Sequence, residues 1–353
     1  MYIILGWSGV HMKKKSRIRR KNLIKIVTAA EAVTALCIVG CSGKFVFSMV
    51  SNINEIPQIS AVHSDEQLLD ASQPDENSVP CTYIQKNKTD AFDGQLVLVN
   101  NNHGYRFADN TDTLIPAHEI KNSSYSLIDH SVILRKETIE ALNALLEDFE
   151  AQAENFDELY EIIIQSGYRS VAKQSVIYND DLAANGTHTS SRAAKPGSSE
   201  HHTGYAVDLS LFHNGGSVEY DGTGDYKWIN DNCYKYGFIV RYKAEKSDIT
   251  GIESEPWHLR YIGIPHSYAV EINGVCYEEY IKFLKNFSFE KPYTITIDGG
   301  KTYQIYYVPL EEDITEIPVP DNFEYSISGN NFDGFIVTVE GEFTPEGSDS
   351  LIQ

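Results

Sequence analysis

Two short blocks of the sequence contain the side chains best suited to bind a metal ion and activate water. The first block, SEHHTGYAVD, starts at Ser199 and joins His201 to Asp208 through small residues that allow a tight turn. The second block, EPWH, starts at Glu255 and ends at His258. Two imidazoles and one carboxylate leave the fourth position of a tetrahedral zinc ion open, which is typical of a catalytic site. Such a metal lowers the pKa of its bound water toward ~7, and Glu255 is placed to accept the proton.

Each of these residues has a simpler interpretation when it is taken alone. A single His or Asp is more often a surface residue or a helix cap than a ligand, and the His-x6-Asp spacing recurs by chance. His202 competes with His201 for the ligand position, and spacing does not choose between them. The prediction of a zinc site therefore depends on the combination of the blocks.

Three ordered blocks resemble the signature of the VanY-type D-Ala-D-Ala carboxypeptidases over roughly residues 90–285. They are SGYRS from Ser166 with Gln174 after it, SxHxxGxAxD from Ser199, and EPWHxRY from Glu255. The resemblance implies an α+β fold of the hedgehog/D,D-peptidase type. We therefore expect a small antiparallel sheet, flanked by helices, that holds a single zinc site.

The resemblance also selects the metal ligands. It implies one zinc ion per chain, bound by His201, Asp208 and His258. His202 stands where the family often has Gln, so we expect it not to be a ligand.

Five further positions match catalytic or substrate-binding positions of the family. The resemblance implies that Glu255 is the general base and that Arg169 stabilises the oxyanion. It implies a substrate site lined by Ser199, Gln174 and Trp257.

The implied function is the removal of a C-terminal D-alanine from peptidoglycan stem peptides, as in a D,D-carboxypeptidase. An L,D-carboxypeptidase acting on tetrapeptide stems and a D-Ala-D-Ala dipeptidase share these motifs, and an anchored domain suits the polymeric wall better than a free dipeptide. A non-catalytic, hedgehog-like, wall-binding module would keep the ligands and could lose the base. The presence of Glu255 and Arg169 favours an enzyme. Serine hydrolysis has little support, because the sequence contains no G-x-S-x-G elbow.

Helices and strands must position these blocks. Residues 136–150 have apolar side chains at three-and-four spacing, which predicts an amphipathic helix. A second helix is expected from Val171 to about Ala184. The runs QLVLV at 95–99 and EIIIQ at 161–165 predict strands, as does the alternation over 257–262.

Glu255 and His258 are three residues apart, so in a regular strand their side chains would point to opposite faces. Pro256 cannot donate a ladder hydrogen bond, which predicts a break just before the strand. Such a break would allow Glu255 to turn toward the metal.

The chain divides into four expected regions. Residues 1–51 form a basic segment followed by a membrane anchor or lipoprotein signal, and residues 52–80 form a disordered tether. Residues 81–289 form the zinc peptidase domain. Residues 290–353 form a small all-β module of unknown role, since the DGGK turn at 298–301 lies between two strand-like runs.

The N-terminal charge pattern predicts attachment to the outer face of a membrane. Eight cations precede the apolar run that starts at Ile26: Lys13, Lys14, Lys15, Arg17, Arg19, Arg20, Lys21 and Lys25. Positive residues stay cytoplasmic, so the rest of the chain is expected outside the cell. Cys41 ends a lipobox-like sequence, but the apolar residues 45–50 after it favour an uncleaved anchor.

The charge of the remaining chain excludes one class of partner. Beyond Cys41 there are 21 cations against 49 acidic residues, a net charge of −28. A body this acidic repels nucleic acid, so we expect no nucleic-acid partner.

Overall fold

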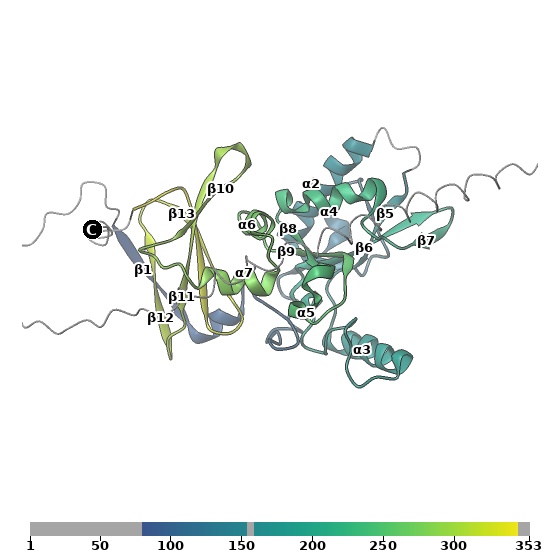
Figure 1. The fold of residues 1–353 in the computed structure, drawn as a ribbon, viewed down its shortest axis with the longest axis horizontal. Coiled ribbons are helices and arrows are strands. Elements are labelled where there is room, and N and C mark those ends of the chain that lie inside the picture. Colours follow the sequence, from purple (N-terminus) through teal and green to yellow (C-terminus); the bar gives the residue numbers. More distant parts are fainter. Residues whose placement is uncertain (1–79, 154–158, 345–353) are drawn as a thin grey trace, which may run out of the picture. The chain divides into compact units, whose positions relative to one another are not determined.

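The computed structural model of the chain describes residues 80–153 and 159–344 (Figure 1). The expected membrane segment and almost all of the expected tether lie outside these residues. Within the described ranges, no helix combines the length and the apolar character that crossing a membrane requires.

The main sheet is mixed. Its strands follow the order β3 (Ser126–Leu127), β5 (Glu161–Ser166), β6 (Ala206–His213), β9 (Glu255–Tyr261) and β8 (Phe238–Tyr242), with β7 (Gly216–Val218) paired to β6. All neighbours are antiparallel except β3 and β5, which run parallel.

The expectation of a purely antiparallel sheet is therefore wrong at one edge. The connection from β3 to β5 contains β4 (Ile133–Arg135) and the helix α2 (Lys136–Gln152). A connection of this length can carry the chain back to the start of the sheet, so that the second strand runs in the same direction as the first.

Helix α2 covers one face of the main sheet, as its apolar spacing predicts. Its buried apolar side chains are Ile139, Leu142, Leu145, Leu146 and Phe149. They share a core with alternate residues of the strands, namely Ile162 and Ile164 of β5 and Val207, Leu209 and Leu211 of β6. Each such side chain contributes about 1.5–3 kcal/mol when it is fully buried. Because strand side chains alternate between faces, Asp208 points away from this core.

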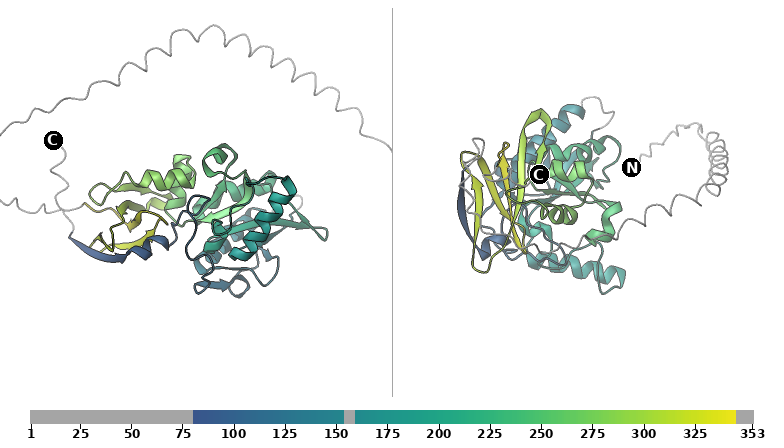
Figure 2. Two further views of the ribbon diagram at one scale, coloured as in Figure 1. Left: turned by 90° about the horizontal axis from the view of Figure 1, so that it is seen from below. Right: turned by 60° about the vertical axis from the view of Figure 1, so that its left-hand side comes forward.

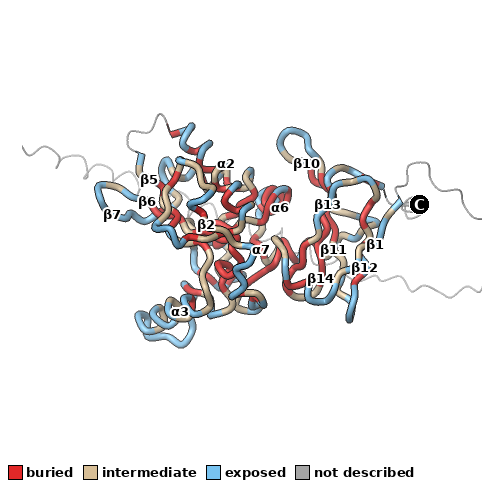
Figure 3. Tube along the Cα trace, turned by 180° about the vertical axis from the view of Figure 1, so that it is seen from behind, coloured by how far each residue is buried: buried red, intermediate tan, exposed pale blue. Residues whose placement is uncertain are grey.

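Helix α3 (Val171–Asn185) forms where the sequence predicts it. The Ser170 hydroxyl caps it by accepting a hydrogen bond from the Lys173 amide at 3.2 Å. The helix ends at Gly186, whose φ of 63° suits glycine. Its one buried residue is Gln174, and Figure 3 shows the rest of the helix mostly exposed.

The remaining elements are short. The helices are α4 (Lys227–Asn232), α5 (Ser247–Thr250), α6 (His266–Asn273) and α7 (Tyr277–Leu284). The strand β2 (Leu114–Pro116) pairs with β4.

The C-terminal segment contains the predicted antiparallel β structure. Its four-stranded sheet has the order β10 (Tyr293–Thr296), β11 (Thr302–Pro309), β14 (Gly334–Glu340) and β13 (Glu324–Gly329). The predicted hairpin is formed by β10 and β11. Its turn needs positive φ at Gly299 (84°) and Gly300 (81°), which glycine adopts without strain.

The first described strand belongs to this β structure as well. The strand β1 (Cys81–Asn87) pairs along its whole length with β12 (Ile314–Pro320), and the two lie side by side in Figures 1 and 2. Residues from both ends of the described chain therefore build this part of the fold.

The apolar run QLVLV, expected as the first clear strand, forms no ladder. The Arg260 Nη2 atom donates to the carbonyls of Gln95 at 2.9 Å and Val97 at 3.1 Å. The Leu96 amide donates to the Ser328 hydroxyl at 2.9 Å. The apolar pattern correctly predicts burial, but distant side chains supply hydrogen bonds that a neighbouring strand would otherwise make.

His266 joins α6 to both α7 and the C-terminal sheet. Its Nδ1 atom lies 2.8 Å from the Tyr280 hydroxyl, and its Nε2 atom lies 2.9 Å from the Thr338 hydroxyl. The side chain is buried, and this burial lowers its pKa to about 3. His266 therefore remains neutral in the folded protein at any pH near neutrality.

We expect His266 to make the fold sensitive to acid. Below about pH 6.5 the unfolded chain takes up a proton that the buried imidazole excludes, so the free energy of unfolding decreases as the pH falls. The loss is about 2 kcal/mol between pH 6.5 and 5, at 1.36 kcal/mol per pH unit. Urea unfolding at several pH values measures it. A His266→Gln variant is expected to be less stable at pH 7 but to have a shallower pH dependence, and equal slopes for the two proteins would contradict the assignment.

Candidate active site

Two adjacent strands and a short turn position the candidate metal ligands. Asp208 of β6 lies directly opposite His258 of β9 in the strand register. His201 lies on a single 3-10 turn, Glu200–Thr203, immediately before β6. This turn ends at Gly204, whose φ of 74° reverses the chain into the strand.

The three side chains meet on the sheet face opposite α2. The His201 Nε2 atom lies 3.0 Å from Asp208 Oδ2, and the His258 Nδ1 atom lies 2.9 Å from Asp208 Oδ1. The two imidazole rings are perpendicular, with centroids 4.9 Å apart. One ligand atom from each residue lies within 4.8 Å of the others. Two nitrogens and one carboxylate oxygen fit zinc with an open fourth position.

The outer nitrogen of each imidazole faces an acceptor oxygen. His201 Nδ1 lies 2.7 Å from the Gly167 carbonyl, which can only accept a hydrogen bond. His258 Nε2 faces Glu200 Oε2 at 3.6 Å. Protons on the outer nitrogens leave the lone pairs of the inner nitrogens available to a metal.

Burial and neighbouring charges shift the pKa values of all three candidate ligands. Burial, together with the nearby Arg169 charge, lowers the pKa of His201 to about 4. Burial alone would raise the pKa of Asp208, but the imidazoles hold it well below its usual range. Burial also disfavours a charged His258, yet the neighbouring carboxylates of Asp208 and Glu200 raise its pKa to about 9. A metal must therefore displace a proton from His258 at neutral pH.

His202 lies outside the ligand group, and backbone groups occupy both of its ring nitrogens. Its Nδ1 atom lies 2.6 Å from the Arg169 carbonyl, and its Nε2 atom accepts from the Gly197 amide at 3.1 Å. His202 therefore connects two loops, and the geometry distinguishes it from His201 where spacing does not.

Glu255 reaches the site through an irregularity in β9. In the strand register, Glu255 of β9 pairs with Tyr242 of β8. Leu259, four residues further along β9, pairs with Val240, which is only two residues from Tyr242. The strand β9 therefore contains extra residues between these two pairs. The predicted irregularity at Pro256 is present, but it lies within β9, which begins at Glu255, and not before the strand. It brings Glu255 Oε2 to 3.7 Å from His258 Nδ1.

The environment of Glu255 suits proton transfer. Burial raises the pKa of its carboxyl group to about 7, although the charge of His258 opposes the shift. A carboxyl group with a pKa near the working pH can both accept a proton and return it.

Arg169 is held beside the ligands by three hydrogen bonds. Its Nη2 atom donates to Ser166 Oγ at 3.0 Å and to Asp208 Oδ2 at 3.2 Å, and its Nη1 atom donates to Gln174 Oε1 at 2.9 Å. The Gln174 amide also donates to the Ala194 carbonyl at 2.8 Å. Gln174, expected to line the substrate site, thus also fixes the position of Arg169.

A cavity of about 220 Å³ opens onto these groups. All eight site residues expected from the sequence line it: Arg169, Gln174, Ser199, His201, Asp208, Glu255, Trp257 and His258. Its other lining residues are Ile177, Arg192, Ala193, Ala194, Tyr242 and Ile252.

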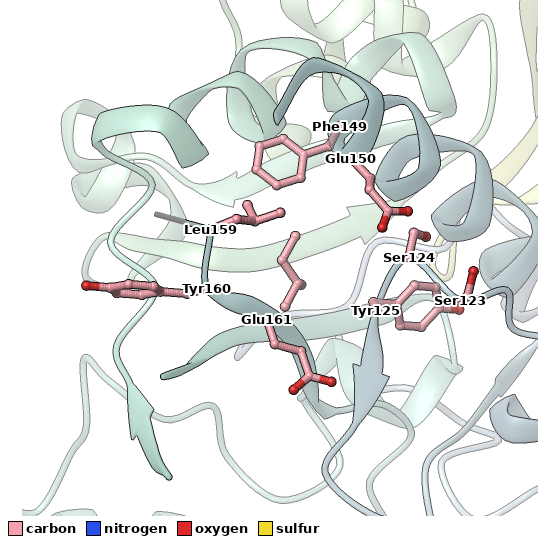
Figure 4. Close-up of a pocket in the computed structure, with 9 residues that line it drawn as sticks. Ser123, Ser124, Tyr125, Phe149, Glu150, Leu159, Tyr160 and Glu161 are labelled. Atoms are coloured by element: carbon pink, nitrogen blue, oxygen red, sulfur yellow. The ribbon is translucent and has the colours of Figure 1, made fainter. Parts of the chain in front are cut away.

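A second cavity of about 260 Å³ contains none of the expected site residues. It lies between the end of α2 and the strands β3 and β5, where Phe149, Tyr125 and Tyr160 line it (Figure 4). The cavity with the imidazoles is therefore the candidate active site.

Four charged residues beside the site were assigned no role from the sequence: the buried Glu200, Arg241 and Arg260, and the half-buried Glu278. Arg241 Nε donates to Glu200 Oε1 at 2.8 Å, and Arg260 Nη1 lies 3.4 Å from the same oxygen. Glu278 accepts from Arg241 at 2.6 and 2.9 Å. The available signal was the occurrence of charged residues inside otherwise apolar strand sequences, FIVRY and HLRY.

Comparisons with known proteins agree with this site. Residues 131–264 match the family model of VanY, D-alanyl-D-alanine carboxypeptidase. A D-alanyl-D-alanine carboxypeptidase of Enterococcus faecium is 34% identical over 275 residues, covering 77% of this chain and 82% of the relative. The putative carboxypeptidase YodJ of Bacillus subtilis (strain 168) is 42% identical over 155 residues, covering 43% and 55%.

One solved structure extends the likeness to the fold. The vancomycin-resistance D,D-dipeptidase VanXYg, in complex with a D-Ala-D-Ala phosphinate analog, has a TM-score of 0.65 at 34% identity. The match covers 74% of this chain and 100% of that one, so it extends beyond residues 131–264.

An α+β fold with a buried His–Asp–His group and an adjacent glutamate defines a hydrolase with a metal-capable site. The sequence likeness makes this assignment more specific. The chain belongs to the VanY family of D-alanyl-D-alanine carboxypeptidases.

Proposed function

We propose that the enzyme removes the C-terminal D-alanine from peptidoglycan stem peptides at a site that holds one zinc ion. The observation that carries the proposal is the convergence of His201, Asp208 and His258 with Glu255 in one cavity. Membership of the VanY family supports the D-Ala-D-Ala bond as the substrate. A zinc ion bound by the three ligands would supply a water of lowered pKa and polarise the scissile carbonyl.

The residues around the ligands would carry out the proton transfers. The Glu255 carboxylate accepts the proton of the attacking water and then delivers it to the nitrogen of the leaving D-alanine. Its pKa of about 7 allows both steps near neutral pH. Glu255 lies beside Tyr242 and Trp257 in the cavity, and these side chains exclude bulk water that would compete for this proton.

Arg169 would stabilise the negative charge on the carbonyl oxygen. Hydrogen bonds to Ser166, Asp208 and Gln174 fix its guanidinium before the substrate arrives. Of its five N–H groups, these bonds leave one on Nη1 and the one on Nε to donate to the oxyanion. A donor already fixed in place has little reorganisation to make during the reaction.

The products from two substrates test the proposal. The purified protein is incubated with zinc and a UDP-linked pentapeptide ending in D-Ala-D-Ala, and separately with the matching tetrapeptide. Mass spectrometry is expected to show the loss of one D-alanine from the pentapeptide. Loss of D-alanine from the tetrapeptide alone would identify an L,D-carboxypeptidase instead. No product from either substrate would favour a non-catalytic module.

We also propose that residues 1–51 hold the enzyme to the outer face of a membrane through an uncleaved anchor. The support is the cluster of eight cations before Ile26 and the apolar run after it. Cell fractionation of wild type and a Cys41→Ser variant tests it. Both proteins are expected in the membrane fraction with unchanged mass. Loss of a lipid from the variant would indicate a lipoprotein, and a soluble cytoplasmic wild type would contradict both routes.

A further inference from the structure

Glu200 lies between a candidate metal ligand and two buried arginines. Its side chain is fully buried on the 3-10 turn that carries His201. One oxygen, Oε1, faces Arg241 Nε at 2.8 Å and Arg260 Nη1 at 3.4 Å. The other, Oε2, faces His258 Nε2 at 3.6 Å. In the described part of the chain, neither Oε2 nor His258 Nε2 has a hydrogen-bond partner within 3.5 Å.

We propose that Glu200 is a positioning residue of the metal site, and this rests on the proposed zinc-dependent function. Its Oε2 atom, 3.6 Å from His258 Nε2, is the carboxylate oxygen that faces this nitrogen, and its negative charge favours a proton on Nε2 rather than on Nδ1. The Nδ1 lone pair then points toward Asp208 and His201, where a metal would bind. Carboxylates that orient metal-bound histidines in this way fix both the ring and its tautomer.

The surrounding cluster determines which oxygen of Glu200 faces His258. Arg241 is fixed by Glu278 of α7 through two hydrogen bonds of 2.6 and 2.9 Å. Arg260 is fixed by carbonyls of the buried QLVLV run. Both guanidiniums also lie 5.6 Å from the centre of the Tyr277 ring. Because the arginines approach Oε1, the carboxylate plane directs Oε2 toward the imidazole.

The charges within the cluster distinguish a positioning role for Glu200 from a role that only neutralises the charge of His258. The two arginines are matched by the two carboxylates of Glu200 and Glu278. The cluster therefore needs no charge from His258, and a metal that displaces the Nδ1 proton would leave the ring neutral, with its Nε2 atom still facing Glu200. A neutral imidazole is the form that binds a metal.

Zinc affinity, measured by competition with a chelator, tests the proposal without use of turnover. The variants Glu200→Asp and Glu200→Gln are expected to bind zinc about 10–100-fold more weakly than wild type. The Asp variant keeps the negative charge beside the two arginines, but its side chain is one methylene shorter, so its carboxylate lies farther from His258. Glu271→Gln is the matched control, because it makes the same chemical change at an exposed carboxylate of α6 that bonds to Lys243 and does not belong to the cluster. We expect its zinc affinity to stay within about twofold of wild type.

Wild-type affinity in a folded Glu200 variant would overturn the proposal, and so would an equal loss of affinity in Glu271→Gln. A wild-type protein that binds no zinc would instead contradict the proposed function. If neither Glu200 variant folds, imidazole NMR of the zinc-bound wild type decides the question. A His258 Nε2 proton that is protected from solvent exchange supports the proposal, and one that exchanges rapidly overturns it.

Discussion

Replacement of Glu255 by Gln is expected to reduce the turnover of D-Ala-D-Ala substrates by at least about 10²–10⁴-fold, the typical contribution of a positioned acid–base group. Gln keeps the size of the side chain and can still form hydrogen bonds, but it cannot accept the proton of the attacking water. The zinc content should hardly change, since Glu255 lies 3.7 Å from His258 and is not one of the three candidate ligands. Turnover at saturating zinc, together with elemental analysis, measures both quantities.

The chain offers a matched control two residues away. Glu253 is exposed and bonds to Ser191, so Glu253→Gln makes the same chemical change outside the cavity and should keep wild-type turnover. If Glu255 instead orients His258, the Gln variant should mainly lose zinc affinity and recover its rate in excess zinc. A Glu255→Gln enzyme with near wild-type turnover in excess zinc would refute the mechanism.

A second large effect is expected at the adjacent histidines. His201→Ala should abolish zinc binding and activity together, because it removes one of three ligands. His202→Ala should retain stoichiometric zinc, because its ring nitrogens already bond to the backbone of Arg169 and Gly197. The His202 variant should instead lose stability, by about 0.5–1.5 kcal/mol per lost hydrogen bond.

Elemental analysis and urea unfolding of the two variants distinguish these roles. The substitutions are identical and neighbouring, so a general effect of losing an imidazole would appear in both proteins. Zinc retained by His201→Ala and lost by His202→Ala would show that the ligand assignment is wrong.

The candidate ligands could be predicted from the sequence because the motif blocks occur together and resemble those of a known family. Local spacing alone accounts only for His201 and Asp208, which are separated by one turn and the start of a strand, whereas His258 reaches Asp208 through the pairing of β6 with β9. The irregularity at Pro256 could be predicted locally, since a proline disturbs the ladder where it stands.

The long-range features could not be predicted in the same way. The QLVLV run has the apolar pattern of a strand, but its hydrogen bonds go to Arg260 and Ser328, more than 160 residues away in sequence. The buried contact between Glu200 and Arg241 likewise forms only when β8 and β9 pair. The pairing of β1 with β12 depends on partners more than 200 residues apart. In each case, the local sequence pattern indicates burial or strand character, but it does not identify the distant residue or strand that makes the contact.

Dependence on a single zinc ion is tested most directly by a zinc titration of protein from which a chelator has removed all metal. Release of D-alanine from the pentapeptide substrate is followed as zinc is added. We expect no activity without metal, a rise proportional to added zinc, and a plateau at one equivalent per chain, because His201, Asp208 and His258 form one site. Full activity in the metal-free protein, or a plateau at two equivalents, would contradict dependence on a single zinc ion.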